Sequence, residues 1–133
     1  MIVVDTNVIG YLFLSSDQSD LAERALRKDN EWAAPILWRS EFSSVLTLYM
    51  RKNILSLEQA QQIMNSALKL LKGREYQVPS YEVLRLTSSS NCSAYDCEFI
   101  ATANDLKVPL LTVDKQLLRE FSSVAISLKS FVG

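Results

Sequence analysis

The chain has 133 residues, of which 48% are apolar and 22% are charged, and its formal net charge is -1. This length and composition predict one folded domain, residues 1–133, and exclude wholesale disorder. The charge excludes a uniformly basic nucleic-acid binder, although local basic patches around an acidic pocket stay open. The sequence has no histidine, so any catalysis must use carboxylates, hydroxyls, lysine or a hard metal ion.

The apolar start of the chain, residues 1–14, does not read as a secretion signal, because it lacks a basic leader and contains Asp5 and Asn7. No apolar stretch is long enough to span a bilayer. Cys92 and Cys97 fit a reducing compartment, as small apolar side chains. We therefore expect a cytoplasmic protein without membrane contact.

The first half of the chain alternates short apolar runs with segments of helical periodicity. Asp17 is the expected N-cap of the second helix, Pro35 is expected to stop the second strand, and Ser56 opens the fourth helix with a capping-box pattern. The predicted elements are strands at 2–4 and 31–34 and helices at about 6–14, 17–28, 36–52 and 57–71.

In the second half, Gly73 ends the fourth helix and Pro79 starts the next one. Strands are predicted at 76–78, 108–113 and 124–126, and helices at about 79–87, 94–106 and 115–121. Strands that alternate with helices predict an α/β sandwich around a mostly parallel sheet. Ligands bind beyond the carboxyl ends of such strands, and Asp5 and Asp114 both lie just past a strand end.

The long helix at 36–52 carries a glutamate on its apolar side. On a helical wheel Glu41 falls inside an arc of apolar residues: Leu37, Trp38, Phe42, Val45, Leu46, Leu48 and Tyr49. A glutamate at the core face is costly unless it is paired or bound to a cation. A buried ion pair and a cation ligand both stay open for it.

The helix at 94–106 repeats this pattern, because Phe99, Ile100 and Ala103 bracket Asp96 on the wheel, whereas Glu98 and Asp105 point the opposite way. Simpler roles exist for three of the acidic residues. Ser93 and Asp96 resemble a capping box, and Asp5 and Asp114 stand where aspartate is a favoured helix N-cap.

Taken together, two carboxylates at strand ends and two on core-facing helix positions indicate a site for a hard divalent cation. Converging carboxylates repel one another, and Mg²⁺ or Mn²⁺ takes oxygen ligands and leaves positions for water and phosphate. Such an ion activates water and stabilises a departing oxygen.

At these residues the chain closely resembles the PIN-domain family, in particular the VapC-like toxins of bacterial and archaeal toxin–antitoxin pairs. The matching segments are residues 2–8, 38–42, 93–97 and 109–115, in order along nearly the whole chain. The resemblance implies a PIN-like three-layer α/β/α sandwich whose mostly parallel central sheet has about five short strands. It also implies an Mg²⁺- or Mn²⁺-dependent endoribonuclease whose acidic residues are Asp5, Glu41, Asp96 and Asp114.

The resemblance further implies a supporting shell of Thr6, Asn7 and Thr112, which orient carboxylates or waters. It implies an RNA substrate, a protein antitoxin and a homodimer. Candidate phosphate contacts, with solvated surface charge as the alternative for each, are Arg39, Arg51, Lys52 and Lys115.

Two other functions stay open at this point. A phosphatase or phospho-acceptor domain could use Asp5 as its nucleophile, but Asn7 stands where haloacid-dehalogenase-like enzymes need a second aspartate. A non-catalytic PIN-fold module that binds RNA or a protein would need no cleavage chemistry. Loss of one acidic position would favour that module, and all four positions are occupied.

Overall fold

The computed structural model describes residues 1–133 and contains a five-stranded sheet in the order β3-β2-β1-β4-β5. The strands are β1 (Ile2–Val4), β2 (Trp32–Pro35), β3 (Glu75–Tyr76), β4 (Leu110–Thr112) and β5 (Ala125–Ser127). Every neighbouring pair is parallel, so the sheet is wholly rather than mostly parallel. All five carboxyl ends therefore lie along one edge.

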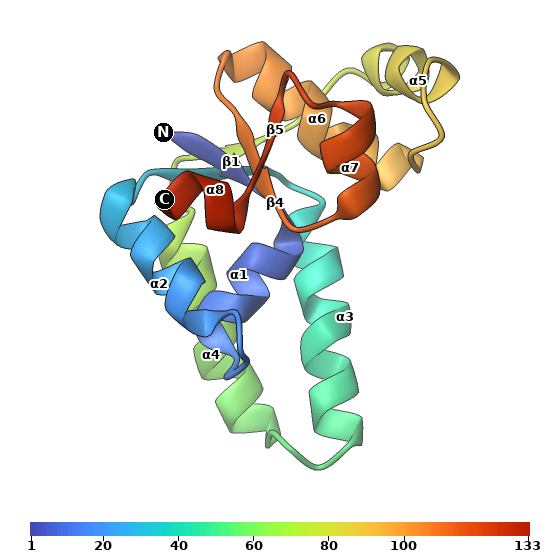
Figure 1. Cartoon of the computed structure of the whole chain (residues 1–133). Coiled ribbons are helices and arrows are strands. Elements are labelled where there is room, and N and C mark those ends of the chain that lie inside the picture. Colours follow the sequence, from blue (N-terminus) through green and yellow to red (C-terminus); the bar gives the residue numbers. More distant parts are fainter.

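Helices cover both faces of this sheet in three layers (Figure 1). On one face α6 packs against β1, β2 and β4, and α5 packs on α6. On the other face α1 and α8 contact β4, and α2 packs against both helices. The helices are α1 (Thr6–Phe13), α2 (Ser19–Lys28), α3 (Trp38–Arg51), α4 (Leu57–Leu70), α5 (Ser80–Ser88), α6 (Ala94–Leu106), α7 (Lys115–Glu120) and α8 (Leu128–Val132).

The core forms around β1, whose three residues are all buried between the two helical layers. Strands buried on both faces are continuous apolar runs instead of alternating ones, as the Ile2–Val4 segment is. No helix is both long enough and apolar enough to cross a membrane.

Two predicted boundaries were wrong for local reasons. Asp17 does not cap α2, which begins at Ser19 with Gln18 at its N-cap and no capping side chain. The turn before it is held by the Ser19 hydroxyl, which accepts from the Ser16 amide at 3.0 Å and donates to the Leu14 carbonyl at 3.1 Å. β2 ends at Pro35, which is itself the last residue of the strand, one position later than predicted. The amides of Ala34 and Ile36 donate to the carbonyls of Arg74 and Tyr76, so the missing N–H of Pro35 breaks no bond there.

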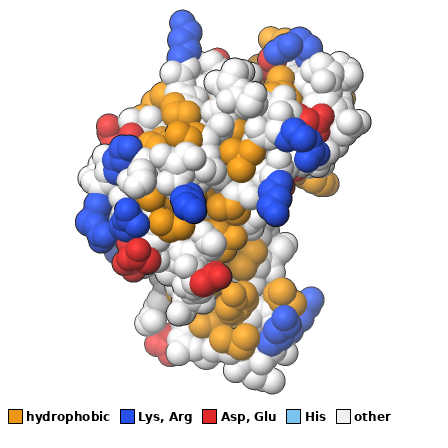
Figure 2. Space-filling model, viewed as in Figure 1, with side chains coloured by type: hydrophobic (Ala, Val, Ile, Leu, Met, Phe, Trp, Pro, Cys, Tyr) orange, Lys and Arg blue, Asp and Glu red, His pale blue; other side chains and the backbone are white.

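Two further differences concern the helix α8 and the exposure of Leu48. The helix α8 was not predicted, and Ser127 caps it by accepting from the Ser130 amide at 3.1 Å. Leu48 does not extend the core face of α3 and is 50% exposed. The α3–α4 hairpin projects away from the sheet (Figure 1), and apolar side chains lie open along it (Figure 2), among them Leu48, Ile54 and Leu57.

Candidate functional site

Four acidic side chains from distant parts of the chain line one cavity of about 350 Å³ beyond the carboxyl ends of β1 and β4. They are the predicted residues Asp5, Glu41, Asp96 and Asp114, and Thr6, Asn7, Ser44 and Val45 complete the lining. The parallel sheet explains this convergence, because each strand delivers the following segment to the same edge. We call this space the carboxylate cavity.

Asp5 lies deepest in the carboxylate cavity, with 7% of its surface exposed. Its carboxylate does not cap α1 and instead accepts a hydrogen bond from the Thr112 hydroxyl at 2.8 Å. Burial raises the pKa of Asp5 to about 6; the Thr112 bond lowers it, and the charges of Asp96 and Glu41 raise it. A carboxylate buried among like charges and without a cationic partner is held in its charged form at a cost.

Glu41 reaches the carboxylate cavity from the first turn of α3. Its Oε1 accepts a hydrogen bond of 2.7 Å from the Thr6 hydroxyl, which fixes the carboxylate against the start of α1. Burial raises the pKa of Glu41, the Thr6 bond lowers it, and Asp96 raises it. The buried ion pair considered from the sequence is not formed.

Asp96 and Asp114 differ in how far helix capping occupies them. The Asp96 amide donates to the Ser93 hydroxyl at 3.1 Å, but the Asp96 carboxylate does not complete a capping box and faces the cavity. Burial raises the pKa of Asp96, and the charge of Asp114 adds to the rise. Asp114 does cap α7, since its Oδ1 accepts from the Leu117 amide at 3.0 Å.

All four carboxylates stand at the beginning of a helix, namely α1, α3, α6 or α7. Helix N-termini carry a partial positive charge that stabilises nearby anions. This partial charge offsets some of the repulsion within the cavity, where none of the four takes part in an ion pair.

The three predicted supporting residues all lie at the site. Thr6 donates to Glu41, and Thr112 joins two aspartates, because its hydroxyl donates to Asp5 and accepts from the Asp114 amide at 3.0 Å. Asn7 is exposed at the rim of the carboxylate cavity.

None of the four predicted phosphate contacts lines the carboxylate cavity. Both oxygens of Glu75 hold the guanidinium of Arg39 at 2.6 Å, on another side of α3. Arg51 and Lys52 stand at the far end of that helix, and Lys115 is exposed beyond Asp114.

Glu98 was predicted to point away from the core, and this was wrong. It is half-buried and lies near enough to Glu41 that the charge of Glu41 adds to the effect of burial, which raises the pKa of Glu98. The wheel treated the far side of α6 as solvent, but α5 packs there.

The lining of the carboxylate cavity suits a hard divalent cation in its donor chemistry, since it offers carboxylate, hydroxyl and amide oxygens and contains no lysine or arginine. No three acidic or thiol side chains are close enough to hold one ion together. Mg²⁺ usually takes only one or two carboxylates directly and keeps several waters. The residues therefore fit Mg²⁺ or Mn²⁺, with the remaining carboxylates acting through water.

Thr6→Val is expected to lower, by about tenfold, the RNA cleavage that the family resemblance implies, because valine keeps the shape of threonine but cannot hold the Glu41 carboxylate in place. Initial rates on a labelled RNA, measured with the melting temperature, test this. Thr6→Ser, which keeps the hydroxyl, should retain most of the activity. Equal losses in both variants would contradict a positioning role for the hydroxyl.

Comparison with known proteins gives one consistent assignment. Ribonuclease VapC3 of Pyrobaculum aerophilum is 26% identical over 126 residues, which cover 92% of this chain and 96% of that protein. The crystal structure of PAE2754 from Pyrobaculum aerophilum has a similar fold, with a TM-score of 0.77 at 18% identity over 98% of this chain and 85% of that one. A toxin–antitoxin complex from Klebsiella pneumoniae aligns with a TM-score of 0.70 at 16% identity, over 96% and 98% of the two chains. The sequence model of the PIN domain matches residues 2–124, and the chain therefore belongs to the PIN domain family.

Proposed function

We propose that this chain is an Mg²⁺- or Mn²⁺-dependent endoribonuclease and the toxin of a toxin–antitoxin pair. The observation that carries the proposal is the carboxylate cavity, where four acidic side chains from four segments meet without a cationic partner. The similarity to a VapC ribonuclease supports an RNA substrate, and the similarity to a toxin–antitoxin complex supports an antitoxin partner.

The acidic residues proposed to hold the cation are Asp5, Glu41, Asp96 and Asp114, some directly and others through water. A bound Mg²⁺ or Mn²⁺ would supply a Lewis acid that activates water and stabilises the departing oxygen of the phosphodiester. Thr112 and Thr6 orient Asp5 and Glu41 for this task. Because the chain has no histidine, a carboxylate of the cavity accepts the proton of the attacking water.

A bound Mg²⁺ or Mn²⁺ would also supply the positive charge that lets the substrate phosphate approach the four carboxylates, because the lining contains no lysine or arginine. The proposal includes a cytoplasmic location, a homodimer and an antitoxin that silences the enzyme. Light scattering of the purified protein gives the oligomeric state, and co-purification with the product of a neighbouring gene identifies the antitoxin.

RNA cleavage with Mn²⁺ or Mg²⁺, with and without EDTA, is the direct test. Asp96→Asn is expected to lower the rate at least about tenfold, because it removes one charge from the cavity. Asp105→Asn is the matched control, since Asp105 is an exposed aspartate on the same helix, and it should leave the rate unchanged. RNA binding without cleavage in the wild type would contradict the proposal and favour a non-catalytic module.

A further inference from the structure

A second hollow, of about 170 Å³, opens between α1 and α3 and adjoins the carboxylate cavity. The two spaces share Thr6, Asn7 and Val45. Whatever occupies the second hollow therefore lies next to a group bound at the carboxylates. None of its eight lining residues is charged, which sets its chemistry apart from that of its neighbour.

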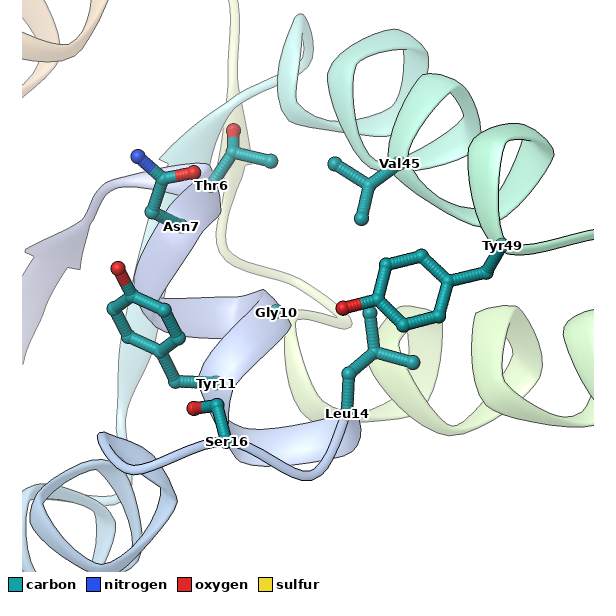
Figure 3. Close-up of a pocket in the computed structure, with 8 residues that line it drawn as sticks. All are labelled: Thr6, Asn7, Gly10, Tyr11, Leu14, Ser16, Val45 and Tyr49. Carbon is teal, nitrogen blue, oxygen red and sulfur yellow. The ribbon is translucent and has the colours of Figure 1, made fainter. Parts of the chain in front are cut away.

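Two tyrosines from different helices form its walls. Figure 3 shows the rings of Tyr11 from α1 and Tyr49 from α3 on opposite sides of the hollow, with Gly10 between them and Asn7 at one end. The hydroxyls of both tyrosines and the amide of Asn7 have no hydrogen-bond partner within the chain. The hollow thus combines aromatic and aliphatic walls with polar groups at its rim.

A group that matches this lining is planar, has apolar faces and carries hydrogen-bonding atoms on its edge. Unpaired nucleobases have this combination, and proteins bind them by stacking on aromatic side chains and by bonding their edges. We propose that this hollow, the base pocket, takes one unpaired nucleobase of the RNA next to the phosphate at the carboxylates. The inference rests on the proposed ribonuclease function.

The base pocket restricts the substrate. A base enters it only when it is unstacked, so the RNA at the cleavage point is single-stranded or in a loop. A base fixed there also sets the register, because it decides which phosphate reaches the carboxylate cavity.

A substitution at Gly10 can fill the base pocket while both tyrosines are kept. A Cβ at Gly10 would meet no atom within 4 Å, so a side chain there enters open space. Leucine is also a better helix former than glycine, so Gly10→Leu should fold. The control is Tyr81→Ala, which removes a tyrosine that is 75% exposed on α5 and lines neither space.

The experiment measures binding of a short unstructured fluorescent RNA in EDTA, with an abasic ribose placed at each position in turn. In the wild type, one abasic position should weaken binding about 10- to 100-fold. Gly10→Leu should weaken binding of the intact RNA by a similar factor and abolish the effect of the abasic position, whereas Tyr81→Ala should behave as the wild type.

The base pocket is overturned if the abasic scan gives the same profile in Gly10→Leu and the wild type, or if no position matters in the wild type. Unchanged RNA binding in Gly10→Leu would contradict the base pocket and would favour a side chain of a protein partner as the occupant of the hollow. Cleavage by the wild type with Mn²⁺ is scored separately. Its absence refutes the proposed function, whereas cleavage with an unchanged KM in Gly10→Leu refutes the base pocket alone.

Discussion

Asp5→Asn is expected to stabilise the metal-free protein at neutral pH by roughly 3 kcal/mol and to lower RNA cleavage more than about 100-fold. Asparagine keeps an oxygen for the Thr112 hydroxyl but removes the most deeply buried charge of the carboxylate cavity. A substitution that improves folding while it destroys activity indicates a site maintained at the expense of stability.

The stabilising effect depends on pH. The pKa of Asp5 rises from 3.8 to about 6 on folding, so between these values the folded state holds a proton that the unfolded state has lost. The free energy of unfolding of the wild type therefore falls as the pH rises from about 4 to about 6 and stays low above that range. Asp5→Asn lacks this loss, so its advantage should appear at pH 7 and vanish below about pH 4.

Urea unfolding in EDTA at several pH values measures this difference. Asp105→Asn controls for a general effect of removing a negative charge, because Asp105 is exposed and remote from the cavity lining. An Asp5→Asn protein that is less stable than the wild type at pH 7 would contradict the view that the Asp5 charge is held at a cost.

Glu75→Ala is expected to destabilise the protein by roughly 3 kcal/mol. The Glu75 side chain is 15% exposed, binds Arg39 through both oxygens and accepts from the indole N–H of Trp38 at 2.7 Å. Alanine leaves the N–H of a fully buried tryptophan without a partner, which is the larger part of the loss. The ion pair contributes less, because half of the Arg39 side chain is exposed.

Chemical denaturation at pH 7 tests this, with Glu75→Gln as the matched control. Glutamine keeps an acceptor for Trp38, so Glu75→Gln should lower the free energy of unfolding by only about 1 kcal/mol. Equal losses in Glu75→Ala and Glu75→Gln would show that the acceptor for Trp38 is not what matters.

The contribution of Glu75 to stability also depends on pH. Hydrogen bonding to Arg39 lowers the pKa of Glu75 against the effect of burial, so this contribution is present at neutral pH and is lost as the pH falls through the lowered pKa.

The features that sequence predicted well depend on local chemistry. The buried run Ile2–Val4 followed by Asp5 predicted β1 and the place of Asp5 at its carboxyl end, and the capping box at Ser56 predicted the start of α4. The helical wheel placed Glu41 and Asp96 on the inner sides of their helices because both lie among residues of the core. Parallel topology then brings the four carboxylates to one edge.

The features that sequence missed depend on partners far along the chain. Arg39 was a candidate phosphate contact, but its partner Glu75 is 36 residues away along the chain, and no local sequence pattern predicts that ion pair. Glu98 was assigned to solvent because nothing in α6 itself reveals that α5 packs beside it. Leu48 was assigned to the core because a wheel does not record where a helix leaves the body of the protein.

The register of the sheet has a consequence for when the carboxylate cavity forms during synthesis of the chain. Val3 of β1 pairs with Leu110 of β4, so β1 gains this neighbour only after the segments from α1 to α6 have been synthesised. A nascent or truncated chain that stops before Asp114 has no complete acidic set, however well its first half folds. The complete carboxylate cavity should therefore form in one step, once Asp114 has been synthesised, and not gradually as the chain grows.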